Sequence, residues 1–190
     1  MPCSTWSRAR RNDGKGPGPL RSDTWLYGFP DLSPANASKV QEANNALKHI
    51  RRITALCMRR RVPFVIENPL TSRLWLTREI GAMRKEGCVD CDLDFCQFGT
   101  PWRKRTRLIS SCSALSSLSN TCQLKSGRRC KSGKRHIQLV GRDSNHVFWT
   151  ARAQAYPKSF CKKAAEIISS VVQTPSSSPP PPDPSYGSGG

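Results

Sequence analysis

The chain has 190 residues, and its 31 Lys and Arg residues outnumber 13 Asp and Glu residues, so the formal net charge is +18. This length allows one domain with a tail, and an apolar fraction of 36% is low for a tightly packed globule but too high for a wholly disordered chain. No apolar run reaches the ~18 residues of a membrane span. No apolar stretch that would mark a secretory signal follows the start. We therefore expect an intracellular protein, nuclear or cytoplasmic, without a membrane partner.

The first third of the chain predicts a loop and then one long helix. Residues 1–33 are rich in Gly, Pro, Ser and Arg, which predicts a mobile basic loop region. Ser38 and Gln41 have the spacing of a capping box. An apolar stripe follows at steps of three and four: Val40, Ala43, Leu47, Ile50, Thr54 and Cys57. The helix should end near residues 59–61, because three arginines there suit its carbonyl end.

The middle of the chain predicts strands that alternate with a helix. Residues 64–66 are rich in β-formers and predict a buried strand, with Glu67-Asn68-Pro69 at its C-terminal end. A helix is expected over 73–85. Residues 89–95 alternate apolar and acidic side chains, which is the period of a strand, and 107–109 predicts a further short strand. This alternation favours an α/β fold.

The last third predicts one helix between two irregular segments. Residues 111–135 are rich in Ser and Lys and show no period, so we expect an irregular insertion. Residues 157–172 carry an apolar face and predict the last helix. Residues 173–190 are rich in Pro, Ser and Gly and predict a disordered tail. We therefore expect one domain over 1–172, followed by that tail.

The positive charge is gathered into clusters near residues 8–11, 51–61, 103–107 and 128–135. One such cluster is as often a solvated surface or a nuclear-import patch as a binding site. Four clusters along a folded chain fit a phosphate backbone better, which indicates DNA or another nucleic acid as a partner.

Three segments carry residues with chemical potential. The first is Pro2-Cys3-Ser4-Thr5-Trp6-Ser7-Arg8-Ala9-Arg10, and Arg21 follows a Gly-rich stretch. The second is Glu67-Asn68 at the end of the predicted strand, and the third is the turn Gly99-Thr100-Pro101 with Arg105 and Arg107 behind it. Ligands of open α/β sheets lie outside the carboxyl ends of the strands. Cys3, Glu67 and at least one of the two arginines should therefore converge on one cleft.

Taken together, these segments resemble the cytosine-5 DNA methyltransferases. That family has a Pro-Cys dipeptide on a mobile loop, then Glu-Asn at a strand end, then an aromatic-Gly turn with Pro and an Arg-x-Arg pair. The resemblance covers residues 2–109 and departs from the family at Trp102, where the family has Gln, and in one residue inserted before Arg105. It implies a partial Rossmann-like methyltransferase sheet that lacks the N-terminal half, which binds the methyl donor.

The resemblance also assigns roles to the residues. Cys3 would be the nucleophile that attacks carbon 6 of a flipped cytosine, because a thiolate is the strongest side-chain nucleophile at neutral pH. Glu67 would act as an acid at ring nitrogen 3, and Arg105 and Arg107 would hold the ring oxygen. The substrate-binding residues would be Pro2, Ser7, Arg8, Arg21 and Asn68.

The implied cofactor is S-adenosylmethionine, and Pro2 is the one residue that the resemblance assigns to its binding. The family's aromatic-Gly-x-Gly turn for this cofactor is absent from the sequence. Activity would therefore need a site of another kind or a partner chain that supplies the methyl-donor half. The alternative is a non-catalytic, basic nucleic-acid-binding protein derived from a mobile element. In this alternative, Cys3 is an incidental thiol and Glu67-Asn68-Pro69 is a turn that ends the strand. The basic run 103–107 is then a solvated strand edge that prevents aggregation.

Nine cysteines without a secretory signal indicate free thiols rather than disulfides. A zinc site usually takes two closely spaced pairs, and the sequence has one such pair, Cys88 and Cys91. Cys96, Cys112, Cys122, Cys130 and His136 are irregularly spaced. Core cysteines are thus the favoured interpretation, and no metal is expected.

Overall fold

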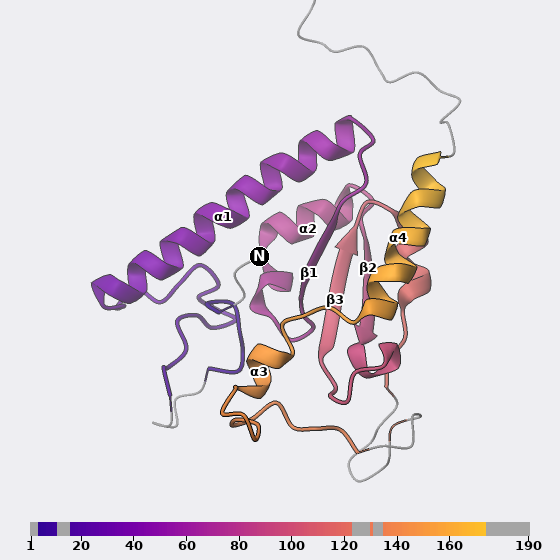
Figure 1. Cartoon of the computed structure of the whole chain (residues 1–190). Helices are drawn as coiled ribbons and strands as arrows, with labels where there is room; N and C mark the ends of the chain where they lie inside the picture. The colour runs from indigo at the N-terminus through magenta and orange to yellow at the C-terminus, as the bar shows by residue number, and fades with distance from the viewer. Residues whose placement is uncertain (1–3, 11–15, 123–129, 131–134, 174–190) are drawn as a thin grey trace, which may run out of the picture.

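We analysed a computed structural model, which describes residues 4–10, 16–122, 130 and 135–173 (Figure 1). The predicted tail lies outside these residues except for its first position. The elements, in chain order, are α1 (Pro34–Arg59), β1 (Val65–Pro69), η1 (Arg73–Leu76), α2 (Arg78–Lys85), β2 (Val89–Asp94), η2 (Phe95–Phe98), β3 (Arg105–Ser110), η3 (Ser113–Leu118), α3 (Trp149–Arg152) and α4 (Lys158–Gln173).

The three strands form one sheet in the order β1-β3-β2. β3 pairs antiparallel with both neighbours, with Glu67 opposite Leu108 on one side and Cys91 opposite Leu108 on the other. β1 and β2 consequently run parallel to each other, and their carboxyl ends lie at the same end of the sheet, where β3 begins. The fold is mixed α/β, as the sequence predicts. The partial Rossmann-like sheet that the resemblance implies is not confirmed, because both strand pairings are antiparallel and a Rossmann-like sheet is mostly parallel.

Helices cover both faces of this sheet, and each face has its own core (Figure 1). On the side of α1 and α2, Ile66 and Ile109 pack with Leu47, Trp75 and Ile80. On the side of α4 and η3, the core residues are Cys91, Leu93, Phe95, Phe98, Leu108, Cys112, Leu115, Leu118 and Phe160. The alternation of strand side chains thus sends successive residues of β1 and β3 into different cores.

The long helix α1 confirms the predicted apolar stripe, since Val40, Ala43, Leu47 and Thr54 are buried. It begins at Pro34, earlier than the capping-box spacing predicts, because proline is well suited to the first helical position. Ser38 donates a hydrogen bond to Glu42 within the helix instead of capping it. In the loop before α1, Gly28 lies so close to Val40 that a β-carbon there would be 2.6 Å from a Val40 methyl group.

Other boundaries differ from the sequence predictions for local reasons. The helix expected over 73–85 is two elements, because Thr77 is extended between η1 and α2 and its hydroxyl donates to the Leu74 carbonyl. β1 includes Glu67, Asn68 and Pro69, which pair with β3, so these residues lie in the strand and not after it. The insertion 111–135 contains η3, and α3 is an element that no periodicity predicted. None of the described helices has both the length and the apolar character that a membrane span needs.

Candidate functional site

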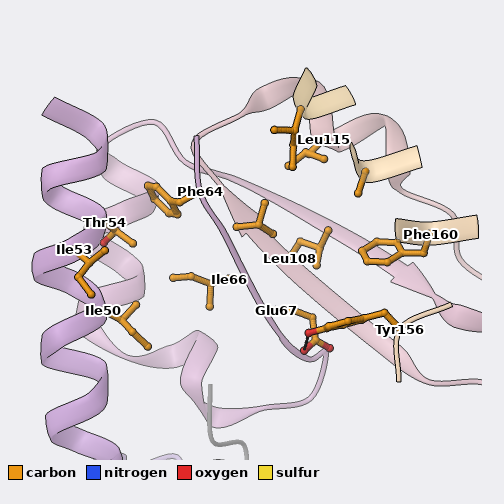
Figure 2. A pocket seen from close by; sticks show the side chains of 13 residues that line it. Ile50, Ile53, Thr54, Phe64, Ile66, Glu67, Leu108, Leu115, Tyr156 and Phe160 are labelled. Atoms are coloured by element: carbon orange, nitrogen blue, oxygen red, sulfur yellow. Dashed lines mark hydrogen bonds between the residues drawn. The ribbon is translucent and has the colours of Figure 1, made fainter. Parts of the chain in front are cut away.

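An open groove of about 480 Å³ lies along β1, between α1 and α4 (Figure 2). Its lining is mostly apolar and includes Ile50 and Ile53 from α1, Phe64 before β1, and Phe160 from α4. Glu67 and Tyr156 lie together at one end of it, as Figure 2 shows. An apolar groove of this size with a few polar groups at one end is typical of a small-molecule or nucleobase site.

Glu67 is the polar centre of this groove end. The Tyr156 hydroxyl donates a hydrogen bond of 3.1 Å to Glu67 Oε2, and Lys104 Nζ lies 3.7 Å from Oε1. Lys104 also lies over the rings of Phe95 and Tyr156, which holds its charge near the carboxylate. Oε1 is buried and accepts no hydrogen bond from the described residues. A buried oxygen of this kind has capacity for a ligand donor.

The two predicted arginines do not lie beside Glu67. Arg107 is opposite Asn68 in the sheet register, one position from Glu67, and Arg105 shares the face of Arg107. The Arg107 guanidinium donates two hydrogen bonds, 2.6 and 2.8 Å long, to the Asp92 carboxylate, which raises the pKa of Arg107. The expectation that these arginines and Glu67 share one cleft is therefore wrong, because neighbouring positions of a strand point to opposite faces of the sheet. This placement counts against the resemblance to the cytosine-5 DNA methyltransferases.

Asn68 lies on the same face as Arg107 and is almost wholly buried. Neither its side-chain oxygen nor its side-chain nitrogen has a hydrogen-bond partner among the described residues. Buried amides are normally satisfied, so this one marks a place where further polar groups would be accommodated. Two consecutive residues of β1 thus have unsatisfied polar atoms, one on each face.

The segment that follows Cys3 packs beside the end of β1. Trp6 is fully buried in the core that contains Ile66 and Leu74, and its carbonyl accepts a 3.0 Å hydrogen bond from the Arg73 amide. Arg21 stacks on the Trp6 ring at 3.6 Å and is itself completely buried. Trp6 and Arg21, which the sequence places in a mobile loop, are therefore fixed to each other and to the core beside β1. The Glu67-Asn68 segment follows Ile66 directly in that strand.

Arg21 is a structural residue in this arrangement and is not exposed to a substrate. Its guanidinium donates to the Leu26 and Val40 carbonyls, to Asn44 Oδ1 and to Thr5 Oγ1. Burial without a carboxylate partner lowers its pKa to about 10.

The remaining predicted residues of the first motif have different environments. Pro2 and Cys3 lie outside the described residues. The Ser7 hydroxyl accepts a hydrogen bond from the Ala9 amide and so supports a local turn. Arg8 is exposed and pairs with Asp23, whose pKa is lowered by the Arg8 hydrogen bond.

The predicted basic clusters are partly neutralised by ion pairs. Within residues 103–107, Arg103 pairs with Asp94, Lys104 with Glu67, and Arg107 with Asp92. Exposed cations concentrate at the C-terminal end of α1, at Arg52, Arg59, Arg60 and Arg61. Most of the cluster at 128–135 lies outside the described residues. The end of α1 is therefore the best-defined basic surface.

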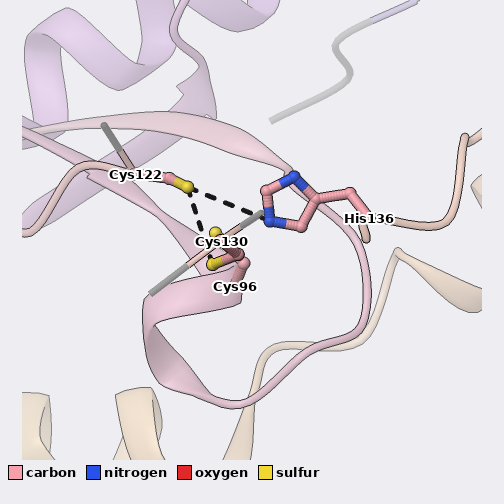
Figure 3. Close-up of side chains that lie close together, drawn as sticks. All are labelled: Cys96, Cys122, Cys130 and His136. Atoms are coloured by element: carbon pink, nitrogen blue, oxygen red, sulfur yellow. Dashed lines mark hydrogen bonds between the residues drawn. The ribbon is translucent and has the colours of Figure 1, made fainter. Parts of the chain in front are cut away.

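A second group of side chains lies beside η2, where the connection from β2 to β3 begins (Figure 3). The ligand atoms of Cys96, Cys122, Cys130 and His136 all lie within 4.8 Å of one another. Such a set could hold a metal ion, so the structure does not support the expectation that no metal is bound. The other candidate thiols conform to the core interpretation: Cys88 is buried on the α2 side of the sheet, and Cys91 and Cys112 on the α4 side.

Sequence reasoning missed Tyr156 and Lys104 as partners of Glu67, and it missed the Cys/His group. Tyr156 lies 89 residues from Glu67, and no local pattern connects the two. The one usable signal for the Cys/His group was that Cys122, Cys130 and His136 lie close together in a polar, irregular segment, whereas Cys96 lies apart from them in η2. The close pair Cys88 and Cys91 drew attention to the wrong thiols.

The described residues do not fit S-adenosylmethionine. A methyl-donor site of the expected kind needs a glycine turn between a strand and the next helix. α1 follows a loop rather than a strand, and the connections after β1 and β2 contain no such turn among the described positions. We therefore derive no step through this cofactor.

Comparisons with family models, with curated proteins and with solved structures found no match for this chain.

Proposed function

We propose that this chain is a cytosine-5 DNA methyltransferase-like protein that binds duplex DNA and receives an extrahelical cytosine at Glu67. One observation carries the proposal: Glu67, at the end of an apolar groove, has a buried carboxylate oxygen without a hydrogen bond from the described residues. The amino group of cytosine would donate a hydrogen bond to this oxygen, and ring nitrogen 3, which accepts, would face the same carboxyl group when it carries a proton.

The groove supplies what a flipped base requires besides Glu67. Phe64, Tyr156 and Phe160 line it and offer apolar and aromatic surface for the base to pack against. Lys104 and Tyr156 fix the carboxylate from the α4 side. We assign to Lys104 the place beside Glu67 that the resemblance gives to an arginine.

The nucleophile in this proposal comes from the sequence. Cys3 precedes Trp6 by three positions, and Trp6 is anchored against β1. The thiolate would add to carbon 6 of the cytosine, forming a carbon–sulfur bond as the 5,6 double-bond electrons move into the ring. A proton taken up from solvent and passed by Glu67 to ring nitrogen 3 would balance the charge.

A second function is favoured by a separate observation. Arg107 is held by Asp92 and Arg21 is buried, so two of the predicted substrate contacts are used inside the fold. A basic DNA-binding protein without catalysis would need only exposed cations such as Arg59 and Arg60.

Covalent trapping separates the two functions. A duplex that contains a cytosine analogue with nitrogen at position 5 is more electrophilic at carbon 6 and traps a thiolate without a methyl donor. We expect a protein–DNA adduct that Cys3→Ser abolishes and that Glu67→Gln slows by about 100-fold. Cys161→Ser and Glu166→Gln remove an exposed thiol and an exposed carboxylate and should leave trapping unchanged. DNA binding without any adduct would select the non-catalytic function.

A further inference from the structure

We propose that Cys96, Cys122, Cys130 and His136 bind one structural Zn²⁺ ion, which fixes the segment after β3 to the β2–β3 connection. This site is independent of the proposed DNA function and would stand without it. Three soft thiolates and one imidazole are a ligand set that zinc prefers, and four protein ligands leave no position open for a substrate.

The distances between the ligand atoms support a tetrahedral ion. With Zn–S of about 2.3 Å and Zn–N of about 2.0 Å, tetrahedral geometry places two sulfurs about 3.8 Å apart, and a sulfur and a nitrogen about 3.6 Å apart. Cys122 Sγ lies 3.6 Å from Cys130 Sγ, and Cys122 Sγ lies 3.9 Å from His136 Nε2 (Figure 3). A disulfide would need sulfurs about 2.05 Å apart, so Cys122 and Cys130 do not form one.

The cluster is buried separately from both apolar cores. Cys96, Cys122 and Cys130 are each 4–5% exposed and pack with one another. Three thiols confined together away from aliphatic partners are explained by a cation that stabilises them as thiolates.

Polar neighbours orient the ligands. Gln97 Nε2 lies 3.5 Å from both Cys96 Sγ and Cys130 Sγ, where it donates to sulfur. Asp94 accepts a 2.7 Å hydrogen bond from the Cys122 amide, and Arg103 binds both Asp94 and the Cys122 carbonyl. Such outer contacts are typical of metal sites because they fix the direction of each ligand.

The ligands come from segments that are far apart in the sequence and are joined by hydrogen bonds such as those of Cys122 with Asp94 and Arg103. Cys96 belongs to η2, and the others follow β3 along the chain. The Ile137 amide donates to the Pro101 carbonyl, which places His136 beside the β2–β3 connection. After η3, the apolar residues of the segment 119–135 are Leu124 and two cysteines, so this segment can bury little apolar surface to stabilise itself. A bound ion would supply that stabilisation.

The test uses the full chain purified under reducing, anaerobic conditions. Elemental analysis should find one zinc per chain, and exchange with Co²⁺ should give the visible absorption of a tetrahedral thiolate site. X-ray absorption should show a shell of three sulfurs and one nitrogen at the zinc. No zinc uptake, a shell dominated by oxygen, or a Cys122–Cys130 disulfide under these conditions would overturn the proposal.

Variants provide a second measurement if loss of a ligand prevents folding. Gln97→Ala keeps all four ligands and should weaken zinc affinity by about 10- to 100-fold in chelator competition. Cys112→Ala removes a thiol that is as buried as the ligands but lies in the α4-side core, and it should leave zinc affinity unchanged. Equal zinc affinity in Gln97→Ala and the original chain would contradict the assigned outer contact, and zinc loss in Cys112→Ala would contradict the assigned ligand set.

Discussion

Replacement of Arg21 by Ala should lower the free energy of unfolding by about 3 kcal/mol. The guanidinium makes four hydrogen bonds and stacks on Trp6, and its removal takes one donor each from Thr5, Asn44 and the Leu26 and Val40 carbonyls. Hydrogen bonds from a charged donor contribute about 1.5–3 kcal/mol each, but part of that gain is offset by the cost of burying the charge. The expected net loss in the free energy of unfolding is therefore close to the contribution of one strong buried hydrogen bond.

Urea unfolding measures this loss. With a slope of about 1–3 kcal/mol per molar for a domain of this size, a change of about 3 kcal/mol shifts the midpoint by about 1–3 M. Arg21→Lys should lose most of the same stability, because an ammonium group cannot reach four divergent acceptors. Arg8→Ala is the matched control, since its exposed pair with Asp23 contributes at most about 1 kcal/mol.

The DNA affinity of Arg21→Ala separates anchoring from substrate contact. If Arg21 is a structural residue, the salt dependence of DNA binding by the folded variant should equal that of the original chain. A variant with unchanged stability and a weakened DNA affinity would refute our assignment of Arg21 to the interior.

Three further predictions follow from charge and burial. DNA affinity, measured by fluorescence titration, should fall steeply between about 50 and 200 mM salt. Arg60→Ala at the end of α1 should reduce the slope of log affinity against log salt by about one. An unchanged slope in this variant would exclude the end of α1 as a DNA-binding surface. Burial and, secondarily, the Asp92 charge raise the pKa of Cys91 to about 11 from 9.0, so the unfolded chain releases this proton first and the free energy of unfolding should fall between pH 9 and 11. Urea melts across that range should show a shallower fall in Cys91→Ala, and equal slopes would contradict the assignment. A thiol reagent should modify exposed Cys161 before buried Cys88, and the reverse order, seen by peptide mapping, would contradict the core placement of Cys88.

Local periodicity predicted the elements of this fold well. The apolar stripe on α1 and the apolar–acidic alternation in β2 correspond to the side chains that are buried in the structure. Local periodicity predicts such elements because burial selects apolar residues at regular positions. The break at Thr77 could not be predicted, because residues 73–85 keep a helical apolar pattern through it. The register of β3 against β1 could not be predicted either, since it depends on contacts between distant segments.

The candidate site shows the same division. The sequence identified Glu67 and Asn68 from their place at a strand end, and they do have unsatisfied polar atoms there. It paired Glu67 with arginines instead of Lys104, because a shift of one residue in a strand reverses the face of a side chain. The Cys/His group was missed because its ligands come from irregular segments, where spacing carries no information about distance.

The preference for an unpaired cytosine tests the central claim most directly. A base that must leave the stack costs a few kcal/mol less to extrude when it is mismatched, so a site that binds extrahelical cytosine should favour a duplex with one mismatched cytosine by about tenfold or more. This measurement needs neither a methyl donor nor the Cys3 thiol. We predict that Glu67→Gln reduces the ratio of the two dissociation constants towards one, whereas Glu166→Gln retains it. Equal affinity of the original chain for the paired and mismatched duplexes would contradict a cytosine site at Glu67.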